Sequence, residues 1–128
     1  MVVLMKIRFM RSGLLLVLTL GTALSSGSAP RAAAAQAERV EIVAERFSFS
    51  PSEFRVKAGV PVEISLRSDD TDHGFRILDT DVNVRIPKRG KKPLTITFQP
   101  PAPGRYTFEC SHVCGAGHAF MRGTIIVQ

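Results

Sequence analysis

The chain has 128 residues, which is enough for one hydrophobic core and too few for two independently folded domains. Its formal net charge of +6 depends on residues 1–35, which hold four of the 17 basic residues and none of the 11 acidic residues. The remaining residues carry a formal charge of only +2, with one short basic cluster, Lys88, Arg89, Lys91 and Lys92. Because nucleic-acid binding needs a basic stripe with interleaved aromatic residues, the composition argues against a nucleic-acid partner.

Residues 1–35 have the order of a secretory signal peptide. The first eleven residues are basic without an acid, an apolar run follows over residues 14–20, and small residues come next. We expect cleavage after Ala35, because Pro30 disfavours cleavage directly after Ala29. An uncleaved anchor is the alternative, but the apolar run is shorter than the ~20 residues that span a bilayer. The sequence therefore predicts a periplasmic or other extracytoplasmic location, with membrane association if the segment is retained and no transmembrane span in the mature chain.

Residues 38–128 are predicted to form one all-β domain. Apolar and polar residues alternate or cluster as in strands over five short runs, 40–44, 62–66, 94–98, 106–110 and 124–127. Turn residues separate these runs, and no long stretch has apolar residues at helical spacing. Short strands at this spacing predict a sandwich of two packed antiparallel sheets.

A cluster of soft metal-ligating side chains lies between the last two predicted strands. After residue 35 the chain has two cysteines, three histidines and one methionine, and five of these six are Cys110, His112, Cys114, His118 and Met121. Thiolate, imidazole and thioether together favour copper, whereas zinc gains little from a thioether. Glycines within the loop permit the tight curvature that would bring these side chains to one point.

The sixth residue, His73, lies far away in the sequence, in the string Asp72, His73, Gly74, Phe75. A ligand from an earlier strand would tie the loop to the sandwich and limit the change in geometry when copper changes charge. In an exported protein, a structural disulfide between Cys110 and Cys114 is the alternative reading of the two cysteines. A disulfide would leave the neighbouring histidines and methionine unexplained.

The spacing Cys-x3-Cys-x3-His-x2-Met, with the upstream histidine string, resembles the cupredoxin domain that carries the binuclear CuA centre. That domain occurs in subunit II of haem-copper oxidases and in nitrous oxide reductase, and the resemblance covers about residues 40–128. It implies a cupredoxin-like Greek-key β-sandwich with two copper ions, one-electron transfer as the function, and no catalysis by the domain alone.

The resemblance also implies a role for each candidate ligand. Cys110 and Cys114 would each bridge both copper ions, and His73 and His118 would each bind one of them. Met121 would be a weak ligand to one copper, and the backbone carbonyl of His112 a weak ligand to the other. The His112 imidazole is not needed as a ligand, but it could compete for metal.

Several functional alternatives remain open at this point. The domain could be an electron carrier for a cytochrome c or another cupredoxin, or the electron-entry subunit of a cytochrome c oxidase. It could also be a periplasmic copper carrier or metallation factor, or a mononuclear blue copper protein, which needs only one cysteine. The partner could be acidic, docking on the basic cluster, or a basic cytochrome that meets Asp69, Asp70 and Asp72.

Overall fold

The computed structural model describes residues 37–128, so the predicted signal peptide lies outside the described residues. Within them the chain forms nine strands and one short 3₁₀ helix. In chain order these are β1 Glu38–Glu45, β2 Ser48–Ser50, β3 Glu53–Val56, β4 Val62–Ser68, β5 His73–Ile77, β6 Asn83–Ile86, β7 Leu94–Phe98, β8 Gly104–Glu109, η1 His118–Phe120 and β9 Arg122–Val127. None of the helices in this part of the chain is long and apolar enough to cross a membrane.

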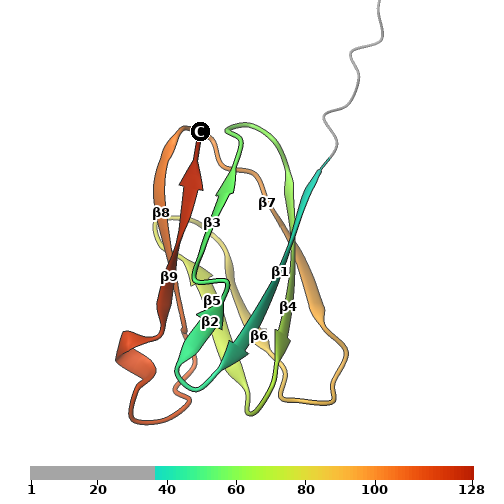
Figure 1. Cartoon of the computed structure of the whole chain (residues 1–128), viewed down its shortest axis with the longest axis vertical. Helices are drawn as coiled ribbons and strands as arrows, with labels where there is room; N and C mark the ends of the chain where they lie inside the picture. Colours follow the sequence, from blue (N-terminus) through green and yellow to red (C-terminus); the bar gives the residue numbers. More distant parts are fainter. Residues whose placement is uncertain (1–36) are drawn as a thin grey trace, which may run out of the picture. The chain divides into compact units, whose positions relative to one another are not determined.

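The strands form two sheets that pack face to face, which confirms the predicted β-sandwich (Figure 1). One sheet has the order β2-β1-β4-β7, and the other has the order β3-β9-β8-β5-β6. Both sheets are mixed rather than purely antiparallel, because β1 pairs in parallel with β4 and β3 pairs in parallel with β9. Between β1 and β4 the chain crosses to the other sheet to form β3, and such a crossover allows parallel pairing where a tight hairpin would not.

The core forms where the alternating side chains of the two sheets meet. Val62, Ile64 and Leu66 of β4 are fully buried, as their period-two spacing predicts. Phe75 of β5 packs against Phe108 of β8 with ring centroids 5.1 Å apart, and Phe49 of β2 lies 5.3 Å from Phe108. These three buried rings join the sheets directly beneath one end of the sandwich, and so support the loops at that end.

Several connections meet at this end, which we call the metal end. It comprises the β1–β2 turn, the β4–β5, β6–β7 and β8–β9 loops, and the strand ends that they join (Figure 1, lower end). All the candidate ligands lie on the β8–β9 loop or at the start of β5. The fold therefore brings His73 to the cysteine loop although 37 residues separate it from Cys110.

Candidate metal centre

The β8–β9 loop is closed by the two strands that it connects. The last ladder pair is Glu109 with Arg122, and the next backbone bond runs from the Cys110 N–H to the Met121 carbonyl at 2.9 Å. Within the loop, the His118 N–H donates to the Gly115 carbonyl at 3.1 Å, which starts the 3₁₀ turn. The loop thus begins and ends on side chains whose backbones are fixed by the sheet.

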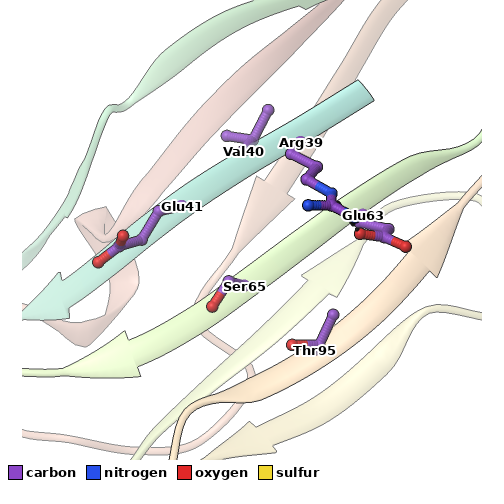
Figure 2. Close-up of a pocket in the computed structure, with 6 residues that line it drawn as sticks. All are labelled: Arg39, Val40, Glu41, Glu63, Ser65 and Thr95. Carbon is purple, nitrogen blue, oxygen red and sulfur yellow. Dashed lines mark ion pairs between the residues drawn. The ribbon is translucent and has the colours of Figure 1, made fainter. Parts of the chain in front are cut away.

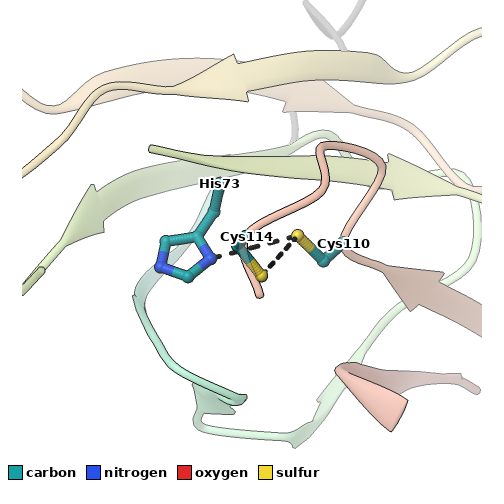
Figure 3. Close-up of side chains that lie close together, drawn as sticks. All are labelled: His73, Cys110 and Cys114. Atoms are coloured by element: carbon teal, nitrogen blue, oxygen red, sulfur yellow. Dashed lines mark hydrogen bonds between the residues drawn. The ribbon is translucent and has the colours of Figure 1, made fainter. Parts of the chain in front are cut away.

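The structure gathers five of the predicted ligand side chains around the two buried cysteines. The Cys110 and Cys114 sulfurs are 3.8 Å apart, and neither cysteine is in a disulfide. The Nδ1 atom of His73 lies 3.9 Å from the Cys110 sulfur, as Figure 3 shows, and the Nδ1 atom of His118 lies 3.9 Å from the Cys114 sulfur. The Met121 sulfur lies 3.9 Å from that of Cys114. Each cysteine sulfur therefore has one imidazole nitrogen beside it.

His112 takes a different place from the other candidates. Its backbone carbonyl accepts from the Cys110 thiol at 3.1 Å, so the carbonyl oxygen faces the cluster. When only the His, Cys and carboxylate ligand atoms of the described residues are compared, one group lies close enough together to share a metal ion. It consists of His73, Cys110 and Cys114.

Gly74 allows β5 to approach the ligand loop closely. Its N–H donates to the Cys110 sulfur at 3.4 Å, a contact that stabilises negative charge on that sulfur. A Cβ atom at this position would lie 2.2 Å from the Ser111 Oγ and 2.5 Å from the His112 backbone nitrogen. Only glycine therefore fits here, which gives a physical reason for its place directly after His73 in the string that the sequence analysis singled out.

Asp70 orients the His73 ring. The Nε2 atom of His73 lies 2.7 Å from the Asp70 Oδ1. Partial burial raises the pKa of Asp70, but hydrogen bonds from His73 and from the Arg46 and Thr71 backbone N–H groups outweigh it and lower the pKa to about 2. An ionised carboxylate only accepts, so Nε2 carries a proton and Nδ1 is the ring nitrogen that faces the sulfurs and can bind a metal.

The β1–β2 turn covers the ligand loop from the opposite sheet. The Arg46 Nε donates to the Cys114 carbonyl at 3.0 Å, while the Arg46 N–H donates to the Asp70 Oδ2 at 2.9 Å. The Phe47 ring lies directly over Gly115 and Gly117, where an added Cβ would come within 2.9 and 2.4 Å of the ring. Arg46 and Phe47, which the sequence analysis did not identify, thus hold both ligand-bearing segments in place.

Burial also affects the protonation of Cys114. Burial, together with the hydrogen bond and the electrostatic effect of the neighbouring Cys110, raises the pKa of the Cys114 thiol to about 11. A protonated thiol is a poor metal ligand, so the Cys114 sulfur must lose its proton when a metal binds. The site therefore suits an ion that binds thiolate strongly.

The donor set and its spacing fit copper. Two sulfurs from cysteine, two imidazole nitrogens and one thioether are soft or borderline ligands. A metal bonded to a nitrogen and a sulfur at ordinary lengths of about 2.0–2.3 Å spans their 3.9 Å separation without moving either atom. The ligand atoms can therefore hold metal with little rearrangement of the loop.

Two hollows flank different parts of the sandwich. One, of about 240 Å³, opens onto the cluster and is lined by Cys110, His118 and a few charged neighbours, including Arg76, Glu109 and Arg122. The other, of about 380 Å³, lies on the outer face of β1, β4 and β7 (Figure 2) and contains an Arg39–Glu63 ion pair at 2.9 Å. None of the candidate ligands lines this second hollow, so it takes no part in the metal site.

The two phenylalanines next to candidate ligands in the sequence, Phe75 and Phe120, differ in burial. The sequence suggests that Phe75 and Phe120 both shield the site from water. Phe75 is fully buried beneath the ligand loop, in agreement with this prediction. Phe120 is 82% exposed, because the 3₁₀ turn directs it outward, so it leaves this side of the site open.

Comparison with known proteins supports this picture. A family profile described as "Cupredoxin-like domain" matches residues 14–127. Over 89 residues the chain is 33% identical to cytochrome c oxidase subunit 2 of Thermus thermophilus, which covers 70% of this chain and 64% of that protein. Over 93 residues it is 31% identical to nitrous-oxide reductase of Ralstonia nicotianae, covering 70% of this chain and 14% of that protein.

Among solved structures, one chain of a heme-copper terminal oxidase dimer superimposes with a TM-score of 0.59 at 32% identity, over 71% of this chain and 65% of that chain. The chain thus spans less than two thirds of the length of each of these relatives. The resemblance seen in the ligand spacing is confirmed at the level of the family: the chain belongs to the cupredoxin-like domain family and is homologous to cytochrome c oxidase subunit II and nitrous-oxide reductase.

Proposed function

We propose that this protein is an electron-transfer protein with a binuclear copper centre of the CuA type. Two bridging sulfurs would come from Cys110 and Cys114, one imidazole each from His73 and His118, and weak ligands from Met121 and the His112 carbonyl. The observation that carries the proposal is the pair of buried sulfurs 3.8 Å apart, each with its own imidazole nitrogen at 3.9 Å. A mononuclear blue site gives no role to a second cysteine.

The surrounding residues suit this function because they fix the ligands before any metal binds. Such a centre supplies reversible one-electron transfer when it is bound. The chain holds Nδ1 of His73 toward the sulfurs through Asp70, and the Gly74 N–H donates to the Cys110 sulfur. Fully buried His73 and nearly buried Met121 keep water from one side of the site. A rigid, dry ligand set changes little in geometry between two charge states, which favours fast electron transfer.

The relatives suggest where such a domain works. Because homologues are subunits of haem-copper oxidases, we propose that the protein passes electrons between a redox protein, such as a cytochrome c or a cupredoxin, and a terminal oxidase or reductase. We also propose that residues 1–35 direct export and that residues 38–128 form the functional domain outside the cytoplasm. A copper carrier would be expected to offer an open, exchangeable site, whereas Cys110, Cys114 and Met121 are buried.

The first test is the copper content and the electron paramagnetic resonance spectrum of the oxidised, copper-loaded protein. Two copper ions per chain sharing one unpaired electron would support the proposal. Cys110→Ser and Cys114→Ser should each abolish the shared-electron spectrum, while Met121→Leu should keep both ions and shift the reduction potential modestly.

His112→Ala provides the matched control for these variants. It removes an imidazole but keeps the backbone carbonyl, so both copper ions and the shared-electron spectrum should remain. His118→Ala removes a proposed copper ligand, so this variant should not retain both copper ions and the shared-electron spectrum. One localised copper per chain in the unaltered protein, or a Cys110–Cys114 disulfide without copper, would overturn the proposal.

A further inference from the structure

The carboxylates around the ligand loops are mostly neutralised by partners within the fold. Asp69 pairs with Arg67, Asp70 accepts from His73 and Arg46, Asp72 accepts from Arg85 and from the Lys88 N–H, and Glu109 pairs with Arg76 and Arg122. At the metal end, Glu45 is the carboxylate left without an ion pair within residues 37–128. These carboxylates at the metal end are therefore largely unavailable to a basic partner.

The opposite holds for the β6–β7 loop, whose residues Lys88, Arg89, Lys91 and Lys92 we call the basic turn. All four side chains are exposed, and none makes an ion pair with the described residues. The backbone fixes the turn in place, because the Lys88 N–H donates to Asp72 at 2.9 Å and the Arg89 N–H donates to the Asp70 carbonyl at 3.2 Å. The basic turn is thus held against the loop that leads into His73.

The ligand loop lies at the same end of the sandwich (Figure 1) and carries exposed apolar side chains. Val113 is 76% exposed and Phe120 is 82% exposed, and Phe47, at 37%, lies over the same loop. Within residues 37–128 these are all of the large apolar side chains that are exposed. Beside Phe120, His118 lines the hollow between Arg76 and Arg122. Apolar contact area next to the ligands, with unpaired cations on another loop of the same end, is typical of a transient protein interface.

We infer that the metal end docks an acidic redox protein, with Val113 and Phe120 in the contact and carboxylates of the partner facing the basic turn. This inference rests on the proposed electron-transfer function and adds the sign of the partner's charge. An anionic membrane would attract the same cations. A redox protein is favoured because the apolar side chains lie on the ligand loop itself, where a docked partner comes closest to the site.

The test compares two double variants with equal net charge. Lys91→Glu/Lys92→Glu reverses the charge of the basic turn, and neither side chain makes a contact that holds the ligand loops. Lys57→Glu/Arg105→Glu makes the same change near the opposite end, next to the last residues of β9. Arg105 loses an exposed 3.6 Å ion pair with Glu53, which contributes little to stability.

Electron transfer to the copper-loaded proteins would be measured by stopped flow with two c-type cytochromes of matched potential, one acidic and one basic. With the acidic cytochrome at low ionic strength, Lys91→Glu/Lys92→Glu should lower the rate constant about tenfold or more, and the control double variant much less. The difference should disappear at high salt. Phe120→Ser should lower the rate at both ionic strengths, because apolar contact is not screened.

Three results would overturn the inference: equal losses in both double variants, a faster reaction of the unaltered protein with the basic cytochrome, or unchanged rates in Lys91→Glu/Lys92→Glu. In the last case, loss of binding to vesicles of anionic phospholipid would assign the basic turn to a membrane. Calorimetric titration of the metal-free protein with the acidic cytochrome tests docking independently of copper. Copper content and the paramagnetic spectrum of each variant show separately whether the proposed centre itself has failed.

Discussion

The contact between Phe47 and Gly117 offers a sharp test of how the β1–β2 turn supports the ligand loop. A Cβ atom at position 117 would lie 2.4 Å from two ring carbons of Phe47, well inside van der Waals contact. The backbone of Gly117, at φ −91° and ψ 5°, is open to any residue, so the ring is the obstacle. Gly117→Ala should therefore lower the free energy of unfolding by about 1–3 kcal/mol, the usual cost of overpacking.

The double variant isolates this contact. In a Phe47→Ala background the same Gly117→Ala change should cost close to nothing, or stabilise by about 0.4–1 kcal/mol through the unfolded chain. Urea unfolding of the four metal-free proteins, with thiols kept reduced, gives a coupling energy that should reach about 1–3 kcal/mol. Because His118 follows Gly117, Gly117→Ala should also shift the reduction potential of the loaded protein. Equal costs of Gly117→Ala in both backgrounds would refute the reasoning.

Three further predictions follow from the site. The folded state lowers the pKa of Asp70 to about 2 from an ordinary 3.8, so its stabilisation of about 2 kcal/mol is complete above about pH 4 and is lost as the pH falls toward 2. In urea unfolding, Asp70→Asn should thus be less stable than the unaltered protein at pH 6 and nearly equal to it at pH 2, with Asp81→Asn as the control for loss of one carboxylate. The pKa of the metal-free Cys114 thiol is raised to about 11, so its alkylation, followed by mass spectrometry, should be slow at pH 7.5 and accelerate as the pH approaches 11. Gly74→Ala should prevent copper uptake, measured as metal content, because the new Cβ meets the His112 backbone nitrogen at 2.5 Å and no side-chain rotation relieves that contact.

The sequence predicted the strands that have a strong alternating pattern. The run 62–66 lies within β4, with its apolar residues fully buried, and 94–98 coincides with β7. The parallel pairing of β1 with β4 was not predictable in the same way, because alternation records which face is buried and not which strand lies beside it. The direction of pairing is set by the crossover to the second sheet.

The candidate ligands could be identified from spacing alone, whereas their supports could not. Asp70 was considered only as a docking residue, since its hydrogen bond to His73 depends on the shape of the β4–β5 loop. Arg46 lies 68 residues from Cys114, whose carbonyl it contacts, and a single sequence carries no sign of such a pair. Residues that hold ligands in place are recognised by geometry, because an arginine or aspartate in this role looks like any surface charge.

All the candidate ligands lie on one strand of one sheet or on the loop that joins two neighbouring strands of that sheet. His73 begins β5, Cys110 follows β8, Met121 precedes β9, and β8 is hydrogen-bonded to both of the other strands. The opposite sheet contributes the covering Arg46 and Phe47 but no ligand atom. Sliding or separation of the two sheets would therefore disturb the contacts of Arg46 and Phe47 with the ligand loop. The hydrogen bonds of β8 to β5 and β9 would still fix the distances between the ligand-bearing segments. In the proposed centre, substitutions between the sheets that leave Arg46 and Phe47 in place should thus change the melting temperature more than the reduction potential.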